Sequence, residues 1–133
     1  MKKILIGIIA IAFVIVAVYG ARQIIRGRKL NRLEKRATEK FDAGNYRLAI
    51  KDYETMLGKL PGKETPRQQR IEHKLAVSYK KLAEAPGVPA FRTVEYYQKA
   101  AAYDKSVVDK QQIDKVITSE LTPDAPDNYD PGI

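Results

Sequence analysis

The pattern of hydrophobic and polar residues divides the chain into a long apolar run and a polar remainder. Residues 4–21 contain no charged side chain, and Ile24 and Ile25 extend the apolar character by one more turn. With a rise of about 1.5 Å per residue, a helix over this run is about 27 Å long, close to the hydrocarbon thickness of a bilayer. The pattern predicts one membrane-spanning helix within residues 1–27, with residues 4–25 in the bilayer.

A cleaved signal peptide is the alternative interpretation of this segment. Lys2 and Lys3 precede the run, and Val18 and Gly20 would provide a cleavage site with small residues. The run is longer than the apolar core of about 7 to 15 residues that is typical of signal peptides. We therefore expect the segment to be retained as an anchor.

Beyond the anchor, apolar residues recur at three- and four-residue steps, which is the spacing of amphipathic helices. A first helix is expected over residues 28–42, continuing directly from the membrane and ending at Gly44. Asn45 is a candidate N-cap for a second helix that runs to Gly58. The expected apolar positions of the second helix are Leu48, Ala49, Tyr53, Met56 and Leu57.

Three more helices are indicated in the remaining sequence. Thr65, Pro66 and Gln68 have the spacing of a capping box with proline at the first helical position, which predicts a third helix. A fourth is expected over residues 90–103 and a fifth up to Leu121. Because no window alternates apolar and polar residues as a strand does, the predicted fold class is all-α.

Basic residues follow the apolar run closely. Residues 22–40 contain eight Lys and Arg and two Glu. Positive charge beside a membrane span resists translocation, so we expect the helical domain to be cytoplasmic. The alternative is an N-in anchor with the domain outside, or in the periplasm. The first four basic residues could also contact anionic lipids. These are Arg22, Arg26, Arg28 and Lys29.

Composition limits the chemistry that the chain can perform. The net charge is +8, but much of the excess lies beside the predicted span, so it does not point to nucleic-acid binding. The absence of Cys excludes disulfides and thiol nucleophiles, and a single His argues against a transition-metal site. No phosphate-binding loop, metalloprotease motif or nucleophile elbow occurs. We expect no cofactor, no metal and no enzymatic activity.

Residues 37–61 resemble the tetratricopeptide repeat (TPR), a helical hairpin of about 34 residues. The matching residues are Ala37, Phe41, Gly44, Asn45, Tyr46, Ala49, Ile50, Tyr53, Leu57 and Pro61. Arg36 and Lys40 depart from the family pattern, which has apolar residues there. A degenerate second copy extends the resemblance to about residue 105. It implies a small solenoid of about two repeats within residues 28–120, with residues 106–120 as a capping helix.

The resemblance also implies where a partner would bind, because the first helices of successive TPRs line a concave surface. The candidate groove residues are Phe41, Arg70, His73, Lys74 and Lys80. They indicate an adaptor or scaffold that binds a soluble protein or other subunits of a membrane complex, with a general preference for acidic partners. His73 and Val77 replace the Lys and Asn with which some TPRs bind a terminal carboxylate. The alternative function is an accessory structural subunit of a larger membrane complex.

The C-terminal tail, residues 121–133, is rich in Pro and Asp. The spacing of its Asp and Asn residues does not match that of a calcium-binding loop. Tyr129 and Ile133 are the tail residues that could anchor a neighbouring subunit, because aromatic and aliphatic side chains contribute strongly to such contacts. We expect the tail to be an interaction arm.

Overall fold

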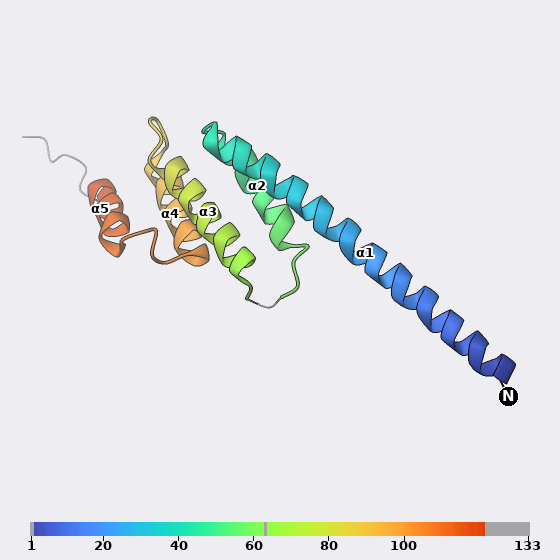
Figure 1. Cartoon of the computed structure of the whole chain (residues 1–133). Helices are drawn as coiled ribbons and strands as arrows, with labels where there is room; N and C mark the ends of the chain where they lie inside the picture. The colour runs from blue at the N-terminus through green and yellow to red at the C-terminus, as the bar shows by residue number, and fades with distance from the viewer. Residues whose placement is uncertain (1, 63, 122–133) are drawn as a thin grey trace, which may run out of the picture.

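The computed structural model describes residues 2–62 and 64–121, and all its regular elements in this part are α-helices (Figure 1). The all-α prediction is therefore confirmed for the described residues. The tail residues Tyr129 and Ile133 lie outside them. The helices are α1 (Lys2–Asp42), α2 (Tyr46–Leu57), α3 (Pro66–Ala83), α4 (Ala90–Tyr103) and α5 (Lys110–Leu121).

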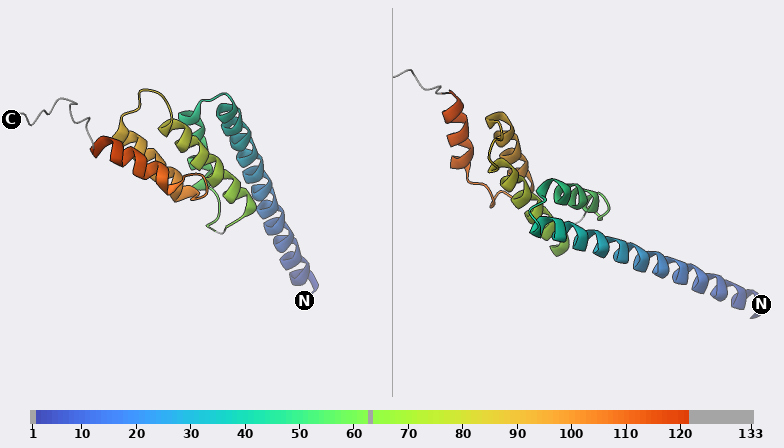
Figure 2. Two further views of the ribbon diagram at one scale, coloured as in Figure 1. Left: turned by 90° about the vertical axis from the view of Figure 1, so that its left-hand side faces the viewer. Right: turned by 90° about the horizontal axis from the view of Figure 1, so that it is seen from above.

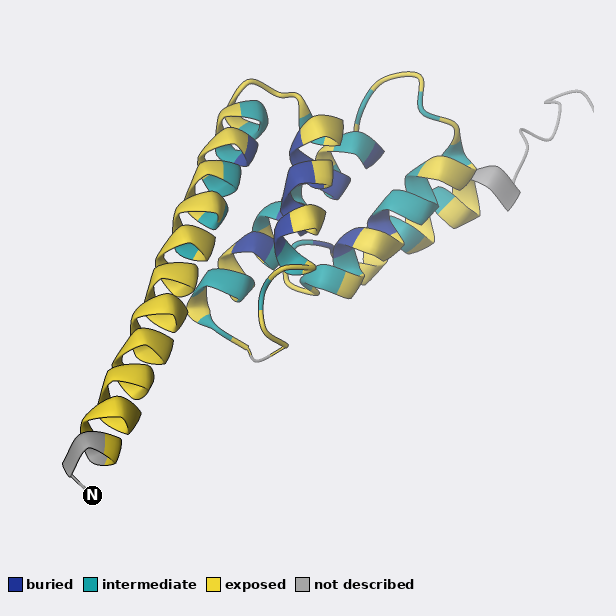
Figure 3. Cartoon of the chain, turned by 90° about the vertical axis from the view of Figure 1, so that its right-hand side faces the viewer, coloured by how far each residue is buried: buried dark blue, intermediate teal, exposed yellow. Residues whose placement is uncertain are grey.

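Helix α1 joins the predicted span to the helical unit without a break. It has 41 residues and passes through Gly27, so the two predicted helices are one. Its N-terminal part projects beyond the other helices, and its large apolar side chains there are between 48% (Val18) and 78% (Phe13) exposed (Figure 3). Among the described helices, α1 is long and apolar enough to span a membrane by length and composition.

The hairpin between α1 and α2 closes through Gly44, whose φ of 77° lies in the left-handed region that glycine adopts without strain. The Asn45 amide donates a 2.8 Å hydrogen bond to the carbonyl of Lys40, and this bond closes the C-terminal end of α1. The expected side-chain cap by Asn45 does not form. With φ of −83° and ψ of 60°, Asn45 does not have the extended backbone of a usual N-cap.

The N-terminus of α3 forms half of the predicted capping box. The Thr65 hydroxyl accepts a 3.2 Å hydrogen bond from the Gln68 amide, and Pro66 occupies the first helical position. The Gln68 side chain, however, donates to Glu72 one turn further along the helix, at 3.0 Å. The start of α3 was thus correctly predicted, although the reciprocal bond of the box is replaced.

The five helices pack in chain order, each against the next (Figures 1 and 2). Ala37 and Ala49 are fully buried where α1 and α2 meet, and Ile71 and Leu75 bring α3 onto the same core. Leu48 was expected to be part of the apolar face of α2 but is 52% exposed, because the buried face is centred on Ala49 and Tyr53. Helix α5 closes the row at the end opposite to α1 (Figure 2).

Candidate functional site

Side chains of α1 and α3 meet along one face of the helical unit, although these helices are separated in the chain by α2. At one end, the Arg67 guanidinium donates to the Asn31 side chain at 2.8 Å and lies 2.8 Å from a Glu34 carboxylate oxygen. Arg70, one turn along α3, lies 3.9 Å from the other oxygen of Glu34. Arg70 is largely exposed and makes only this long contact among the described residues. Its guanidinium therefore has N–H donors that remain available to a binding partner.

The other end of this face combines a cation with an aromatic ring. The Lys74 ammonium lies 5.5 Å from the centre of the Phe41 ring and donates a 3.3 Å hydrogen bond to Thr38. Tyr46 packs edge-on against Phe41 with ring centres 5.5 Å apart, which fixes the ring orientation. We call the residues of this face the α1–α3 surface. They are Asn31, Glu34, Thr38 and Phe41 of α1 and Arg67, Arg70 and Lys74 of α3.

The α1–α3 surface carries a positive balance, with three cationic side chains and the single carboxylate of Glu34. Of the predicted groove residues, Phe41, Arg70 and Lys74 lie on it. His73 and Lys80 do not: His73 contacts Asp104 after α4, and Lys80 lies 4.0 Å from Glu84, one turn further along the chain. The two lie seven residues apart on a stripe of α3 that differs from the stripe of Arg70 and Lys74, and only the packing of the helices decides which stripe faces α1. Arg67 is the cation that the sequence analysis missed.

Behind this surface, Asp52 of α2 forms an ion-pair cluster that sequence reasoning did not find. Its carboxylate accepts hydrogen bonds from Arg36 at 3.0 Å and Lys40 at 2.6 Å, the two residues that depart from the TPR pattern. Burial by itself raises the pKa of Asp52, but the hydrogen bonds and charges of Arg36 and Lys40 outweigh it and leave the pKa lowered. The sequence contained a signal for this burial, because Asp52 follows Ala49 by three positions and residues at that spacing lie on the same face of a helix.

A second cluster joins α2, α3 and α4. The Tyr79 hydroxyl donates a 2.7 Å hydrogen bond to Glu54, and the Tyr103 ring stacks on Tyr79 with ring centres 6.0 Å apart. Burial, and then the bond to the Glu54 carboxylate, raises the pKa of Tyr79. Because the hydroxyl serves as a donor to Glu54, the cluster connects three helices and presents no reactive group.

Within the described residues, His73 pairs with the carboxylate of Asp104. His73 Nδ1 lies 2.7 Å from one oxygen of Asp104, while the other oxygen accepts bonds from the Ser106 amide at 2.9 Å and hydroxyl at 2.7 Å. The Ser106 hydroxyl bond, followed by the His73 contact, lowers the pKa of Asp104 to about 2. Since Ser106 donates to the carboxylate and not to the imidazole, this arrangement orders the turn after α4 and does not activate a nucleophile.

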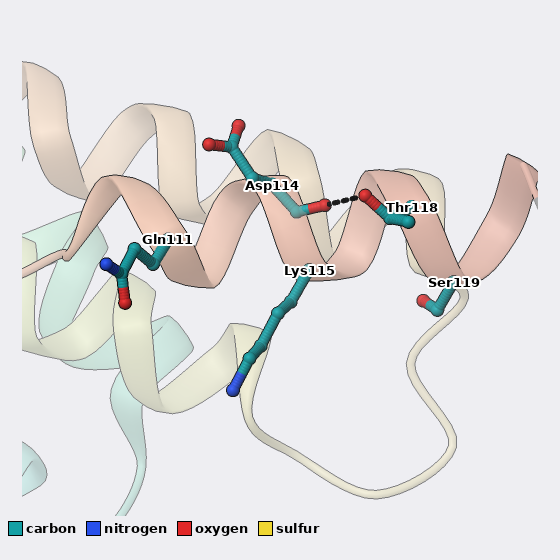
Figure 4. Close-up of a pocket in the computed structure, with 5 residues that line it drawn as sticks. All are labelled: Gln111, Asp114, Lys115, Thr118 and Ser119. Carbon is teal, nitrogen blue, oxygen red and sulfur yellow. Dashed lines mark hydrogen bonds between the residues drawn. The ribbon is translucent and has the colours of Figure 1, made fainter.

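A shallow hollow of about 550 Å³ lies along α5 (Figure 4). All its lining residues belong to this helix, and the Thr118 hydroxyl donates to the Asp114 main-chain carbonyl at 2.7 Å. With side chains from one helix only, the hollow has no converging polar groups. Within residues 2–62 and 64–121 no cluster of three His, Asp or Glu is placed to bind a metal. The α1–α3 surface is therefore the better candidate for binding.

Comparison of the chain with family models, with curated proteins and with solved structures finds no match. The functional interpretation consequently depends on the contacts and charges of this chain. Among the surfaces described above, the α1–α3 surface is the one that combines an aromatic ring with three cations, of which Lys74 lies directly beside the ring.

Proposed function

We propose that the protein is a membrane-anchored, non-enzymatic adaptor whose TPR-like helical unit binds an acidic segment of a partner protein at the α1–α3 surface. The observation that carries this proposal is that Lys74 lies 5.5 Å from the centre of the Phe41 ring, while Arg70, one turn away on α3, has a largely exposed guanidinium. Cations attract acidic side chains to the surface, while a half-buried aromatic ring provides the apolar contact that most binding sites need.

The anchor in this proposal is the N-terminal part of α1. Between Ile4 and Ile25 the large apolar side chains that the structure describes are at least 48% exposed, and a run of exposed apolar side chains of this length is stable in a bilayer. Because α1 continues without a break into the helical unit, the position of the anchor also determines where the α1–α3 surface lies relative to the membrane.

The TPR-like architecture is supported by the residues at the first hairpin. Ala37 and Ala49 have no exposed surface, and small residues at these positions allow α1 and α2 to approach closely. Gly44 provides the turn. In such a hairpin stack α1 and α3 are the first helices of successive repeats, so the α1–α3 surface corresponds to the concave side on which TPR proteins bind partners.

Site-specific photocrosslinking tests the proposal in cells. A benzoylphenylalanine at Phe41 should crosslink a partner through an acidic segment, identified by mass spectrometry of the crosslinked peptide. The same probe at Phe91, which is 66% exposed on α4, is the matched control and should not give this product. The Arg70→Glu/Lys74→Glu variant should abolish the crosslink, whereas the charge-matched Lys51→Glu/Lys115→Glu variant, on exposed positions of α2 and α5, should retain it.

Three outcomes would contradict the adaptor function. They are no crosslink at Phe41, a crosslinked segment without acidic residues, or equal loss in the two charge-reversal variants. Isolation of the chain in a native gel distinguishes an adaptor from the alternative function, an accessory structural subunit. An adaptor migrates largely alone after detergent extraction, while an accessory subunit migrates with its neighbours in fixed stoichiometry.

A further inference from the structure

A pocket of about 680 Å³ lies between α1 and the connection from α2 to α3. Helix α2 runs back along α1 toward the N-terminus, so the residues that follow α2 reach the part of α1 just beyond the apolar run (Figure 1). The pocket therefore combines segments about 30 residues apart in the chain. Its main lining residues are Arg26, Lys29 and Leu30 of α1 and Lys59, Leu60 and Pro61 of the connection.

The pocket has the charge and shape of a site for an anion that carries an apolar group. Arg26, Lys29 and Lys59 line it, and no carboxylate is among its lining residues. None of these three cations has an ion-pair partner within the described part of the chain. Further along α1, by contrast, Arg36 and Lys40 are paired with Asp52.

The pocket also lies at the depth of lipid headgroups if the apolar part of α1 spans a membrane. The last exposed apolar side chain of the run is Ile25, and Arg26 to Leu30 follow it by about 1.5 to 7.5 Å along the helix axis. A bilayer has a headgroup layer of about 5 to 7 Å on each side of its hydrocarbon core. The three cations are thus placed at the level of the phosphate groups.

We propose that this pocket binds the phosphate headgroup of an anionic phospholipid, with the acyl chains lying along the apolar face of α1. This inference rests on the proposed membrane anchoring of α1. The planar guanidinium of Arg26 can bind two phosphate oxygens at once, and Lys29 and Lys59 add point charges. Because Lys59 lies beyond α2, a bound headgroup attaches the helical unit itself to the bilayer surface. That contact would fix the direction in which the α1–α3 surface faces.

Native mass spectrometry of the full chain in detergent micelles tests the site. We expect the first phosphatidylglycerol to bind at least ten-fold more tightly than phosphatidylcholine, and excess inorganic phosphate not to displace it. The Arg26→Gln/Lys29→Gln/Lys59→Gln variant should lose this preference. The matched Arg32→Gln/Lys35→Gln/Lys51→Gln variant removes the same charge from exposed positions of α1 and α2 outside the pocket and should stay within two-fold of the wild type.

The single variants Lys59→Gln and Lys51→Gln test the site without a large change in charge, and only Lys59→Gln should weaken binding. Equal weakening in the two triple variants would show a diffuse attraction and overturn the proposal, as would an unchanged preference in the Lys59→Gln variant. Displacement by inorganic phosphate would indicate a site for the free ion. Carbonate extraction of membranes tests the anchor separately, since a chain that stays in the membrane but shows no preference refutes the pocket alone.

Discussion

Arg36 of α1 donates two hydrogen bonds, each 3.0 Å long, to the two carboxylate oxygens of Asp52 on α2. Lys40, one turn further along α1, donates a third at 2.6 Å. The Arg36 side chain is 58% exposed, whereas the Asp52 side chain is only 8% exposed. The carboxylate is thus the member of the pair that cannot be fully hydrated, and its partners on α1 compensate for its burial.

Replacing Asp52 with Asn should destabilise the helical unit by about 1.5 kcal/mol, because charge-assisted hydrogen bonds are lost from a buried position while the shape is kept. Chemical denaturation of the full chain in detergent, followed by the near-ultraviolet circular dichroism of its buried tyrosines, measures the effect. Asp114→Asn, on an exposed face of α5, is the control and should be neutral. Equal stability of the two variants would show that the cluster contributes nothing.

The same variant should show a defined pH dependence. Burial raises the pKa of Asp52, and Arg36 and Lys40 lower it further than burial raises it, so the folded-state pKa lies below that of an unfolded chain. Its contribution to stability is therefore complete above the unfolded value of about 3.9 and is lost as the pH falls through the folded-state pKa. The stability difference between wild type and Asp52→Asn should be constant near neutral pH and shrink below about pH 4.

Overpacking at Ala49 tests the packing of the first hairpin. Ala49 has no exposed surface where α2 meets α1, so Ala49→Leu should cost about 1 to 3 kcal/mol of unfolding free energy. Ala102→Leu makes the same change at an exposed position of α4 and should be nearly neutral. The denaturation measurement described for Asp52 compares the two. Equal losses would contradict the close approach of α1 and α2 at this position.

Local features were sufficient to predict where most helices begin and end. The hydroxyl of Thr65 and the ring of Pro66 act within one turn of α3, and Gly44 alone allows the turn after α1, so these signals can be seen in a single sequence. The long apolar run likewise indicated a helix by its own length. Asn45 occupies the predicted N-cap position of α2, but its side chain makes no capping hydrogen bond, because its backbone conformation depends on the hairpin as a whole.

Contacts between helices could not be predicted in the same way. Arg36 and Asp52 are 16 residues apart in the sequence, and His73 and Asp104 are 31 residues apart. Each pair comes into contact only when the helices pack. The candidate groove residues of α3, His73 and Lys74 among them, were expected to line one surface with Phe41. The packing instead separates them, with Lys74 toward Phe41 and His73 toward the end of α4. Helical periodicity identifies a stripe, but the crossing of neighbouring helices decides what the stripe faces.

The carboxyl group of Asp104 provides a direct test of the turn after α4. Its pKa is lowered to about 2 by the Ser106 hydroxyl first and by His73 second. Ser106→Ala should therefore raise the pKa of Asp104 more than His73→Ala does, with Ser119→Ala as an unaffected control. Titration by nuclear magnetic resonance of the Asp104 carboxyl carbon measures all three.

The sign of the pH effect at Asp104 follows from the lowered pKa. Stability from this carboxylate is fully present above the unfolded value of about 3.9 and disappears as the pH falls through about 2. A larger shift in His73→Ala than in Ser106→Ala would show that the imidazole, and not the hydroxyl, holds the carboxylate in its charged form.

Membrane orientation is determined by the charges beside the span while the chain inserts, before the helices pack. Residues 22–40 hold eight Lys and Arg and two Glu, and pairing with Asp52 cannot neutralise Arg36 or Lys40 while the chain is still inserting. The helical unit should therefore stay cytoplasmic. The chain has no Cys, so Lys81→Cys, at an exposed position of α3, introduces a single thiol. This thiol should react with a membrane-impermeant maleimide only after cell lysis. The Arg28→Glu/Lys29→Glu/Arg32→Glu variant removes the charge bias and should increase labelling of intact cells. Labelling of the Lys81→Cys chain without lysis would place the helical unit on the outside.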